Sequence, residues 1–407
     1  MTSEYDILIV GGGMVGASLA RAISGQGLRI AVVEAWPYGS AAQPSYDDRV
    51  LALSWGTRRI LRGMGLWEAL RPEAQPILDI HISDRGHFGF TRLNSRQEGV
   101  EALGYVITAR ALGEVLLKGL GEVVDIDLLC PASLEGFIFT QSGVTVHLDV
   151  SGKKESVSAR LLVAADGGDS RVRELLSIPM KERVYGQTAV IANITPERPH
   201  RGVAFERFTD SGPLAMLPMT DDRCSLVWTA KDAQVPELMG LDDAAFLTRL
   251  QERFGYRLGQ LRRVGRRVAY PLQLRQAQEQ VRPHVALIGN ASHVIHPVTG
   301  QGFNLGIRDV AALADILADV AACGGDPGSL ENLQRYAEWR RQDQQRVVLI
   351  TDTLARLFAN PLAPLRVVRN LTLLGLDIAP GLKHLVARQF MGLNGRLPRL
   401  ARGVPLG

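Results

Sequence analysis

The sequence predicts an α/β fold in which a parallel sheet is interwoven with an antiparallel sheet and followed by a basic, helical C-terminal region. Three observations support this prediction. Residues 5–34 follow the pattern strand, glycine turn, helix, strand; residues 184–229 are a succession of strand patterns; and residues 289–309 form a glycine-rich loop between a strand and a helix. With 407 residues, 46% of them hydrophobic, the chain can bury a large core.

Composition favours a globular protein of a reducing compartment. The first apolar run, residues 7–10, is shorter than the apolar segment of a signal peptide, and no uncharged run of about 18 residues predicts a spanning helix. The three cysteines, Cys130, Cys224 and Cys323, are scattered, odd in number and without metal-binding spacing. We therefore expect a cytoplasmic protein without a metal site.

The net charge of +4 is unevenly distributed. From residue 366 onward seven basic residues stand against one acid, Asp377, which gives this segment a charge of +6. The basic residues are Arg366, Arg369, Lys383, Arg388, Arg396, Arg399 and Arg402. A basic, leucine-rich tail suits an anionic membrane surface or an acidic partner. A solvated helix face explains the same pattern, so both interpretations stay open.

The first glycine turn predicts a dinucleotide site. A strand at residues 5–10 leads into a GxGxxG turn and a helical pattern, and the next strand ends at Glu34. Gly11 allows a tight turn, Gly13 lets the backbone approach a pyrophosphate, and Gly16 lets helix and strand pack. An acid at this position favours FAD or NAD over NADP without deciding between the first two. The expected contacts are Gly11, Gly13, Met14, Val15, Gly16 and Glu34.

Three residues between the glycine-rich segments are further candidates. Arg49 precedes a strand pattern and either reaches the pyrophosphate or lies on the surface, and the sequence leaves this open. Residues 105–117 predict a helix with Arg110 near its first turn. Asp166 follows the strand 161–165, at the edge where open α/β sheets bind ligands, although an Asx turn capping the next helix is compatible with the same pattern.

The strand-rich middle of the chain predicts an inserted antiparallel sheet. Its strand patterns cover residues 187–194, 202–209, 214–218, 225–229 and 267–272. Phe205, Met216 and Pro218 give this sheet an apolar lining, which makes it the natural wall of a substrate pocket. A place in the core is the alternative for each of them taken singly.

The late loop predicts the floor of a cofactor site. Residues 289–309 contain four glycines, one proline and two histidines. Glycine and proline suit a loop that lies against a flat ligand, and the following helix directs free N–H groups at an anion. For His293 and His296, a structural hydrogen bond is at least as good an interpretation as proton transfer. The expected contacts are Asn290, Pro297, Gly300, Gly302, Phe303 and Asn304.

Together the GxGxxG turn, Asp166-Gly167 and the late motif resemble the FAD-dependent aromatic hydroxylases, or class A flavoprotein monooxygenases, over residues 4–360. The resemblance implies a p-hydroxybenzoate-hydroxylase-like, Rossmann-type fold with tightly bound FAD, and NADPH or NADH as a transient co-substrate. It places Asp166 near the pyrophosphate, the late motif at the ribityl and isoalloxazine, and Pro297 and His296 in the flavin-facing loop as catalytic candidates. The family usually has aspartate where this chain has Asn290, whose carbonyl can still accept a ribityl hydrogen bond.

Within that group, residues 83–87, 204–209, 212–218 and 300–306 resemble the ubiquinone-pathway hydroxylases, most closely the UbiH type. This resemblance implies hydroxylation of 2-polyprenyl-6-methoxyphenol to the 1,4-benzoquinol with O₂. The insoluble tail of such a phenol implies contact with a membrane or with assembly proteins, for which the basic C-terminal segment is the candidate. No nucleic-acid partner is implied. Another ring position, another phenol, or a non-catalytic prenyl-lipid carrier are the alternatives.

The same resemblance divides the chain into interwoven domains. We expect a discontinuous FAD-binding domain at residues 1–76, 100–180 and 276–350. Residues 77–99 and 181–275 are expected to form the substrate-binding sheet, and residues 351–407 a helical, basic C-terminal segment. A halogenase is disfavoured because the five tryptophans never fall two residues apart.

Overall fold

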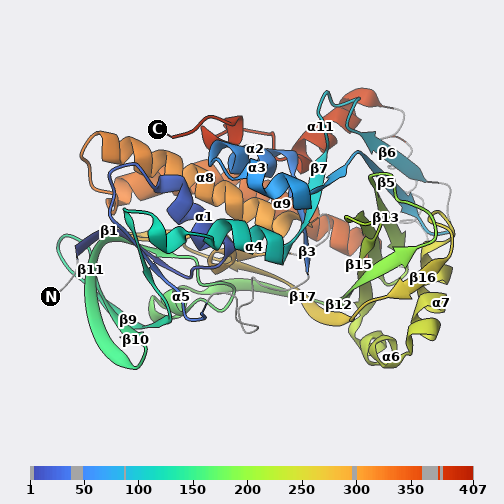
Figure 1. The fold of residues 1–407 in the computed structure, drawn as a ribbon, viewed down its shortest axis with the longest axis horizontal. Helices are drawn as coiled ribbons and strands as arrows, with labels where there is room; N and C mark the ends of the chain where they lie inside the picture. The colour runs from blue at the N-terminus through green and yellow to red at the C-terminus, as the bar shows by residue number, and fades with distance from the viewer. Residues whose placement is uncertain are drawn as a thin grey trace.

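The computed structural model describes residues 4–37, 49–86, 89–295, 300–359, 375 and 379–406. Its helices and strands form the mixed α/β fold that the sequence predicts. Two large sheets hold most of the strands, and a small third sheet adjoins them. Figure 1 shows the two large sheets at opposite ends of the long axis.

The first sheet contains the predicted nucleotide-binding strands. Its main path is β18-β19-β11-β1-β2-β8, parallel from β19 to β8, with β10 and β9 attached to β11 as an antiparallel extension. Its strands are β1 (Glu4–Val10), β2 (Ile30–Val33), β8 (Ile126–Leu129), β9 (Ala132–Phe139), β10 (Val144–Val150), β11 (Lys153–Ala164), β18 (Val281–Arg282) and β19 (Val285–Leu287).

Strand β1 is buried on both faces, which explains its continuous apolar run. Ile7 and Ile9 face a core shared with helices α1 (Met14–Ile23), α4 (Ala109–Leu117) and α8 (Gln301–Ala322). The alternate residues, Leu8 and Val10, pack with residues of β10 on the other face. Short helix α5 (Arg171–Leu175) follows β11.

The second sheet is the predicted antiparallel insertion. Its order is β20-β17-β12-β15-β14-β13-β5-β6, and β16 also pairs with β12. Its strands are β5 (Asp79–Asp84), β6 (Phe90–Asn94), β12 (Met180–Pro196), β13 (Val203–Thr209), β14 (Gly212–Pro218), β15 (Cys224–Lys231), β16 (Leu261–Val264), β17 (Val268–Ala277) and β20 (His293–Val294). Helices α6 (Val235–Gly240) and α7 (Asp243–Phe254) join a core on one of its faces.

A three-stranded sheet, β3-β7-β4, adjoins the two large ones. Its strands are β3 (Val50–Ser54), β4 (Gln75–Ile77) and β7 (Gly104–Thr108), and β3 continues into α2 (Trp55–Gly63) and α3 (Trp67–Leu70). The predicted helix at residues 105–117 was wrong in its first four residues. These form β7, because pairing with both β3 and β4 stabilises an extended backbone, and the helix begins at Ala109.

The C-terminal part of the chain is helical where it is described. Helix α9 (Leu330–Ala359) packs against α8, and α11 (Pro380–Phe390) and the 3₁₀ turn η6 (Leu400–Arg402) follow. Other 3₁₀ turns are η1 (Arg71–Glu73), η2 (Leu120–Glu122), η3 (Asp232–Gln234) and η4 (Gly289–Ala291). Within the described ranges, no helix is long and apolar enough to cross a membrane.

Candidate functional site

Three segments far apart in the sequence end at one edge of the first sheet. Val10 of β1 is paired with Ala164 of β11, and the amide of Ile288, which follows β19, donates to the Ala164 carbonyl over 3.0 Å. The glycine turn, Asp166 and the late loop therefore leave the sheet side by side. This edge holds the carboxyl ends of parallel strands, where open α/β sheets bind ligands.

The glycines of the first turn are required by close contacts. Gly11 has φ +101°, and a Cβ on it would lie 2.5 Å from the Ala165 carbonyl oxygen. A Cβ on Gly16 would lie 1.9 Å from the Gly11 carbonyl oxygen, so only glycine lets α1 start here. Gly13 is the N-cap of α1 without a side-chain cap, and the first turn contains no acid. Its free N–H groups form a cradle for a phosphate.

Glu34 lies at the end of β2 beside this cradle. Its Oε2 accepts from the Gly12 amide over 2.8 Å and its Oε1 from the Trp36 amide over 2.9 Å, which fixes the carboxylate in place. The side chain is buried, yet each oxygen keeps a second lone pair. This placement suits an acceptor for ribose hydroxyls.

Asp166 contributes an acceptor that the described protein leaves unused. Its Oδ2 accepts from the Val172 amide over 3.2 Å, whereas its Oδ1 is buried and has no partner within the described residues. Burial raises the pKa of this carboxyl, while a hydrogen bond with Ser170 acts in the opposite direction. A buried oxygen without a partner is costly, so it indicates a ligand that carries hydroxyl or N–H donors.

The two predicted arginines lie near each other on the third sheet. Val50 is paired with Thr108, so Arg49 and Arg110 flank the same end of the β3–β7 pair. The Arg49 guanidinium lies 5.3 Å from the centre of the Tyr270 ring, and Arg110 is exposed in the first turn of α4. Both positions stay predictions as cofactor contacts.

The late loop packs directly on the first motif. Gly289 has φ +57°, and a Cβ on it would lie 3.0 Å from the Val15 side chain. Gly306 on α8 also lies against Val15, which with Met14 opens helix α1. The Asn290 side chain is exposed beside this contact.

Helix α8 begins where the isoalloxazine was expected. The catalytic candidates His296 and Pro297 lie outside the described residues. Gly300 is the N-cap of α8 with φ +62°, and a Cβ on Gly302 would meet no atom within 4 Å, which leaves room for a ligand. Phe303 instead packs partly buried against the core of the first sheet.

Asn304 holds the start of α8 to strand β3. Its Oδ1 accepts from the Ser54 amide over 2.8 Å and from the Thr57 hydroxyl over 2.7 Å. Its Nδ2 donates to the carbonyls of Ala52 and Gly300 over 2.7 and 2.8 Å. Because both N–H groups are already used, Asn304 supports the loop through the protein and has no N–H left for a ligand.

Asp309 anchors the late loop from below. Its Oδ2 accepts from the Gly289 amide over 3.2 Å and lies 2.6 Å from His293 Nε2. Its Oδ1 accepts from Arg340 Nε over 2.8 Å and from Gln344 over 3.0 Å. Burial raises the pKa of Asp309, but His293 and Arg340 outweigh it and hold the pKa below its usual range. The structural interpretation of His293 therefore has direct support.

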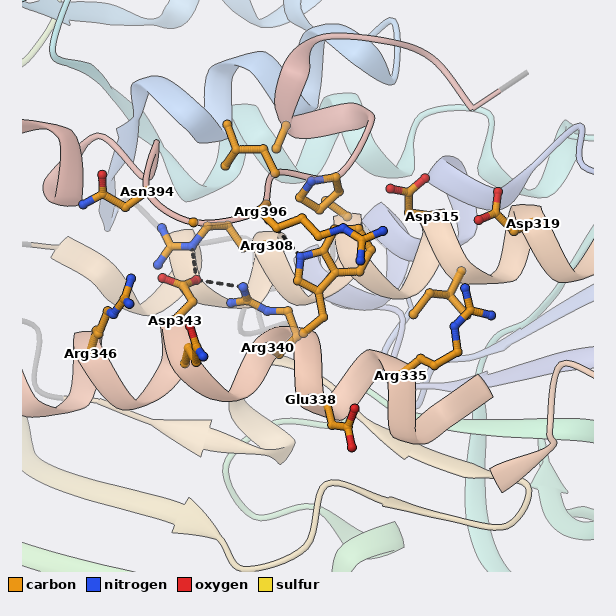
Figure 2. A pocket seen from close by; sticks show the side chains of 18 residues that line it. Arg308, Asp315, Asp319, Arg335, Glu338, Arg340, Asp343, Arg346, Asn394 and Arg396 are labelled. Atoms are coloured by element: carbon orange, nitrogen blue, oxygen red, sulfur yellow. Dashed lines mark hydrogen bonds and ion pairs between the residues drawn. The ribbon is translucent and has the colours of Figure 1, made fainter. Parts of the chain in front are cut away.

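A polar groove of about 390 Å³ lies between α8, α9 and residues 394–398. Figure 2 shows Arg308 and Arg340 both directed at Asp343, at distances of 2.8 and 2.7 Å. Arg308 and Arg340 are both buried, so this network fixes α8 against α9 beneath the late loop. No sequence motif marks it, because its members come from two helices.

A second, largely apolar cavity of about 520 Å³ adjoins the start of α8. Ala52, Ser54, Gly300 and Asn304 line the end near the expected flavin. Strands β13, β14 and β15 form a wall, and α11 lies opposite with Leu385, Val386, Phe390 and Met391. The contribution of α11 carried no signal in the sequence beyond leucine-rich character.

The predicted pocket residues differ in their position relative to this cavity. Phe205 lines the cavity, although its ring packs against Phe254. Met216 and Pro218 do not line it, because side chains alternate along β14. Pro213, Ala215 and Leu217 face the cavity, and Met216 is fully buried in the core on the opposite face.

The residues present fit an FAD molecule. The phosphate cradle at the start of α1 lies between Glu34, which follows β2, and the unpartnered Asp166 Oδ1, which follows β11, because β1 is the strand between these two. A ribose, a pyrophosphate and further hydroxyl donors in this order match the arrangement. The apolar cavity adjoins the start of α8, at the end of the late loop. A dinucleotide alone needs no such second chamber.

Comparison with known proteins agrees with this geometry. The chain matches the FAD binding domain family over residues 4–351. It is 40% identical to ubiquinone hydroxylase UbiL of Rhodospirillum rubrum, over 98% of this chain and 93% of that one. It is 32% identical to 3-demethoxyubiquinol 3-hydroxylase of Escherichia coli, over 97% and 100%.

Among solved structures, p-nitrophenol 4-monooxygenase PnpA of Pseudomonas putida superimposes with a TM-score of 0.80 at 21% identity, covering 97% of this chain and 100% of that one. This likeness concerns the fold alone. The family match and the two relatives show the protein family as well as the fold. The chain therefore belongs to the FAD binding domain family and, within it, to the FAD-dependent monooxygenases that include the ubiquinone hydroxylases.

Proposed function

We propose that this monooxygenase hydroxylates the ring of a polyprenylated phenol in ubiquinone biosynthesis, converting 2-polyprenyl-6-methoxyphenol to the 1,4-benzoquinol. The observation that carries the proposal is the apolar cavity of about 520 Å³ that opens beside the FAD site. Its lining suits an alkylated ring better than a charged substrate. The names of the relatives, all from sequences that align over nearly the whole chain, support the same pathway.

FAD supplies the chemistry that activates O₂, and NADPH or NADH is its reductant in this proposal. The chain's own residues bind and orient. The amides of Gly13, Met14 and Val15 at the start of α1 receive the pyrophosphate. Glu34 and Asp166 accept from hydroxyls, and Asn290 contacts the ribityl chain. Pro297 and His296 stay proposed as flavin neighbours.

The ring position follows from the substrate's own chemistry. An electron-rich phenol reacts ortho or para to its oxygen. In a 2-polyprenyl-6-methoxyphenol both ortho carbons carry substituents, so the para carbon is the remaining position. The apolar walls keep water from the reacting ring.

The prenyl tail of the proposed substrate has to reach the cavity from a lipid phase, so we propose a peripheral membrane contact. On α11, next to the cavity, Leu382 and Leu385 are 51% and 61% exposed, and Lys383 and Arg388 lie on the same helix. Exposed leucines with basic residues suit an anionic lipid surface or an assembly protein that presents the substrate. We propose this face of the chain for that contact, at the cytoplasmic side of the inner membrane.

The domain division is also part of the proposal. We assign FAD binding to residues 1–76, 100–180 and 276–350, and the substrate wall to residues 77–99 and 181–275. We assign residues 351–407 to a C-terminal helical segment. The separation of the described strands into two large sheets supports this division.

One experiment tests the function. Purified holoenzyme receives NADH or NADPH and 2-polyprenyl-6-methoxyphenol, and products are identified by mass spectrometry. We expect substrate-stimulated NAD(P)H oxidation and the 1,4-benzoquinol. Oxidation without any hydroxylated product would reject the substrate, and a protein that binds the phenol without flavin or NAD(P)H oxidation would be the lipid carrier.

A further inference from the structure

Glu206 occupies an unusual position in the cavity wall. It lies in β13 opposite Ala215 of β14 and Ile82 of β5. Along β13, side chains two residues away share its face, and these are Ala204 and Phe208. All four neighbours are apolar and line the same cavity as Glu206. The carboxylate therefore projects into an apolar chamber.

No other ionisable side chain lines this cavity among the described residues. In the part of the chain that the structure describes, Glu206 also forms no hydrogen bond or ion pair. Burial alone raises the pKa of its carboxyl to about 7. An unpaired carboxylate in such a place costs stability, and isolated perturbed acids of this kind are typical of functional sites.

The ionisable groups of the surrounding elements are directed elsewhere. His81 of β5 is paired with Phe205, so it shares the opposite face of the sheet, and Arg207 of β13 lies on that face as well. On α11, His384 pairs with Glu98 at 2.5 Å. On α9, Asp352 accepts from Tyr185 and pairs with Arg183. Strand β14 contributes no ionisable side chain to the wall.

We propose that Glu206 receives the phenolic hydroxyl of the substrate and accepts its proton. In this step the phenol O–H bond breaks, its electron pair stays on the phenol oxygen, and a carboxylate oxygen of Glu206 gains the proton. The ring then carries more electron density at its ortho and para carbons when it takes up oxygen. As the product ring regains aromaticity, the hydroxylated ring carbon releases its C–H proton to solvent, and the first phenol oxygen takes its proton back from Glu206. This inference rests on the proposed function only in that the substrate is a phenol.

The energetics of the transfer are suitable for a general base. A free phenol has a pKa of about 10, which is about three pKa units above that of a carboxyl near 7. Full proton transfer to Glu206 is therefore unfavourable before the reaction, and the proton moves as the ring reacts. A base with a pKa near the working pH is the most effective kind. An ionised carboxylate also accepts a stronger hydrogen bond than a neutral amide.

The first test uses the whole holoenzyme and Glu206→Gln, which keeps shape and hydrogen bonding but cannot take the proton. We expect kcat to fall by about 100-fold or more, and the rise of kcat around pH 7 to disappear. FAD content and its reduction by NAD(P)H should be unchanged. Glu155→Gln, an exposed glutamate on β11, is the matched control and should behave as the wild type. An unaltered rate and pH profile for Glu206→Gln would overturn the proposal.

The second test is independent of turnover. Oxidised holoenzyme is titrated with 2-allyl-6-methoxyphenol and with its methyl ether, and binding is followed by the flavin spectrum. Wild type should bind the phenol at least about tenfold more tightly than the ether, and Glu206→Gln and Glu206→Ala should lose most of this preference. Equal preference in all three proteins would reject the role of Glu206. If wild type shows the preference but hydroxylates no prenylphenol, the proposed substrate fails while this site stands.

Discussion

His293 and Asp309 form a buried pair in which Nε2 of the imidazole lies 2.6 Å from Oδ2 of the carboxylate, and neither side chain is more than 2% exposed. The pair joins the late loop to α8. Arg340 adds a second buried contact from α9 on the other carboxylate oxygen. The positions of Gly289 and His293 at the start of the late loop therefore depend on a buried charge network.

Asp309→Asn should destabilise the protein by about 3–5 kcal/mol, because it leaves the buried Arg340 and His293 without their shared anion. Urea unfolding measures the loss. Asp319→Asn is the control, since Asp319 is 57% exposed on the same helix and, among the described residues, its carboxylate pairs only with Arg399. The control should lose at most about 1 kcal/mol. Equal losses for the two variants would contradict the anchoring role of Asp309.

Gly16→Ala should yield protein with little bound FAD, because the new Cβ would lie 1.9 Å from the Gly11 carbonyl oxygen and displace the phosphate cradle. The absorbance ratio of flavin to protein after purification checks this. Gly136→Ala, where a Cβ meets no atom within 4 Å, should stay fully yellow. Full flavin content in Gly16→Ala would sink the assignment of the first motif.

The sequence could predict those parts of the fold whose signals are local. The GxGxxG turn, Glu34 and Asp166 each follow a short apolar strand, and the structure brings all three to one edge. The prediction of secondary structure failed where pairing with distant strands decides the backbone conformation. Residues 105–108 are β-branched or aromatic and were wrongly joined to the helix that follows them, whereas pairing with two neighbouring strands holds them extended as part of β7.

The cavity wall could be predicted only as a region. Met216 and Pro218 were expected to face the substrate, yet they lie on the face of β14 that is turned away from the cavity. Side chains alternate between the two faces of a strand, but when nearly all residues of the strand are apolar the sequence does not tell which set faces the cavity. Glu206 was missed for the same reason. From the sequence alone, a glutamate in a strand is expected to lie on the solvent-exposed face. Only the structure shows that α11 lines the same cavity as Glu206 and so covers this face.

Glu206→Gln should also change how stability depends on pH. The folded carboxyl keeps its proton up to about pH 7, whereas the unfolded one loses it above its ordinary value of 4.5. The unfolded state thus binds fewer protons between these values, so the free energy of unfolding falls by about 3 kcal/mol as pH rises from 4.5 to 7.

The variant lacks this contribution, and the other titrating groups are common to both proteins. The difference in unfolding free energy between Glu206→Gln and wild type should therefore grow in favour of the variant across that window and level off above pH 7. Chemical denaturation at several pH values measures it. A constant difference would show that Glu206 is solvated.

Ala215 and Met216 provide a test of which face meets the substrate. Ala215→Phe should fill the cavity and lower kcat/KM for the prenylated phenol by about tenfold or more, with FAD content and stability nearly unchanged. Met216→Ala should cost about 2–5 kcal/mol of stability, because it opens a hole in a fully buried core, and leave kcat/KM near wild type at low temperature. The reverse pattern would place the pocket on the other face of the sheet.

The proposed lipid contact can be separated from the fold of the tail. Deleting residues after 366 would also remove Arg399, which binds Asp315 and Asp319 on α8, so deletion mixes two effects. Point variants on α11 avoid this.

Leu382→Ser combined with Arg388→Glu removes an exposed leucine and reverses one charge, and should weaken binding to anionic phospholipid vesicles by at least about tenfold. Lys153→Glu, an exposed basic residue at the start of β11, makes a charge change of the same size away from the cavity and should bind vesicles as tightly as wild type. Sedimentation with vesicles, with turnover of a short-tailed phenol measured in parallel, checks the result. If both variants bind equally, the basic C-terminal segment is a solvated helix face and the substrate reaches the cavity by another route.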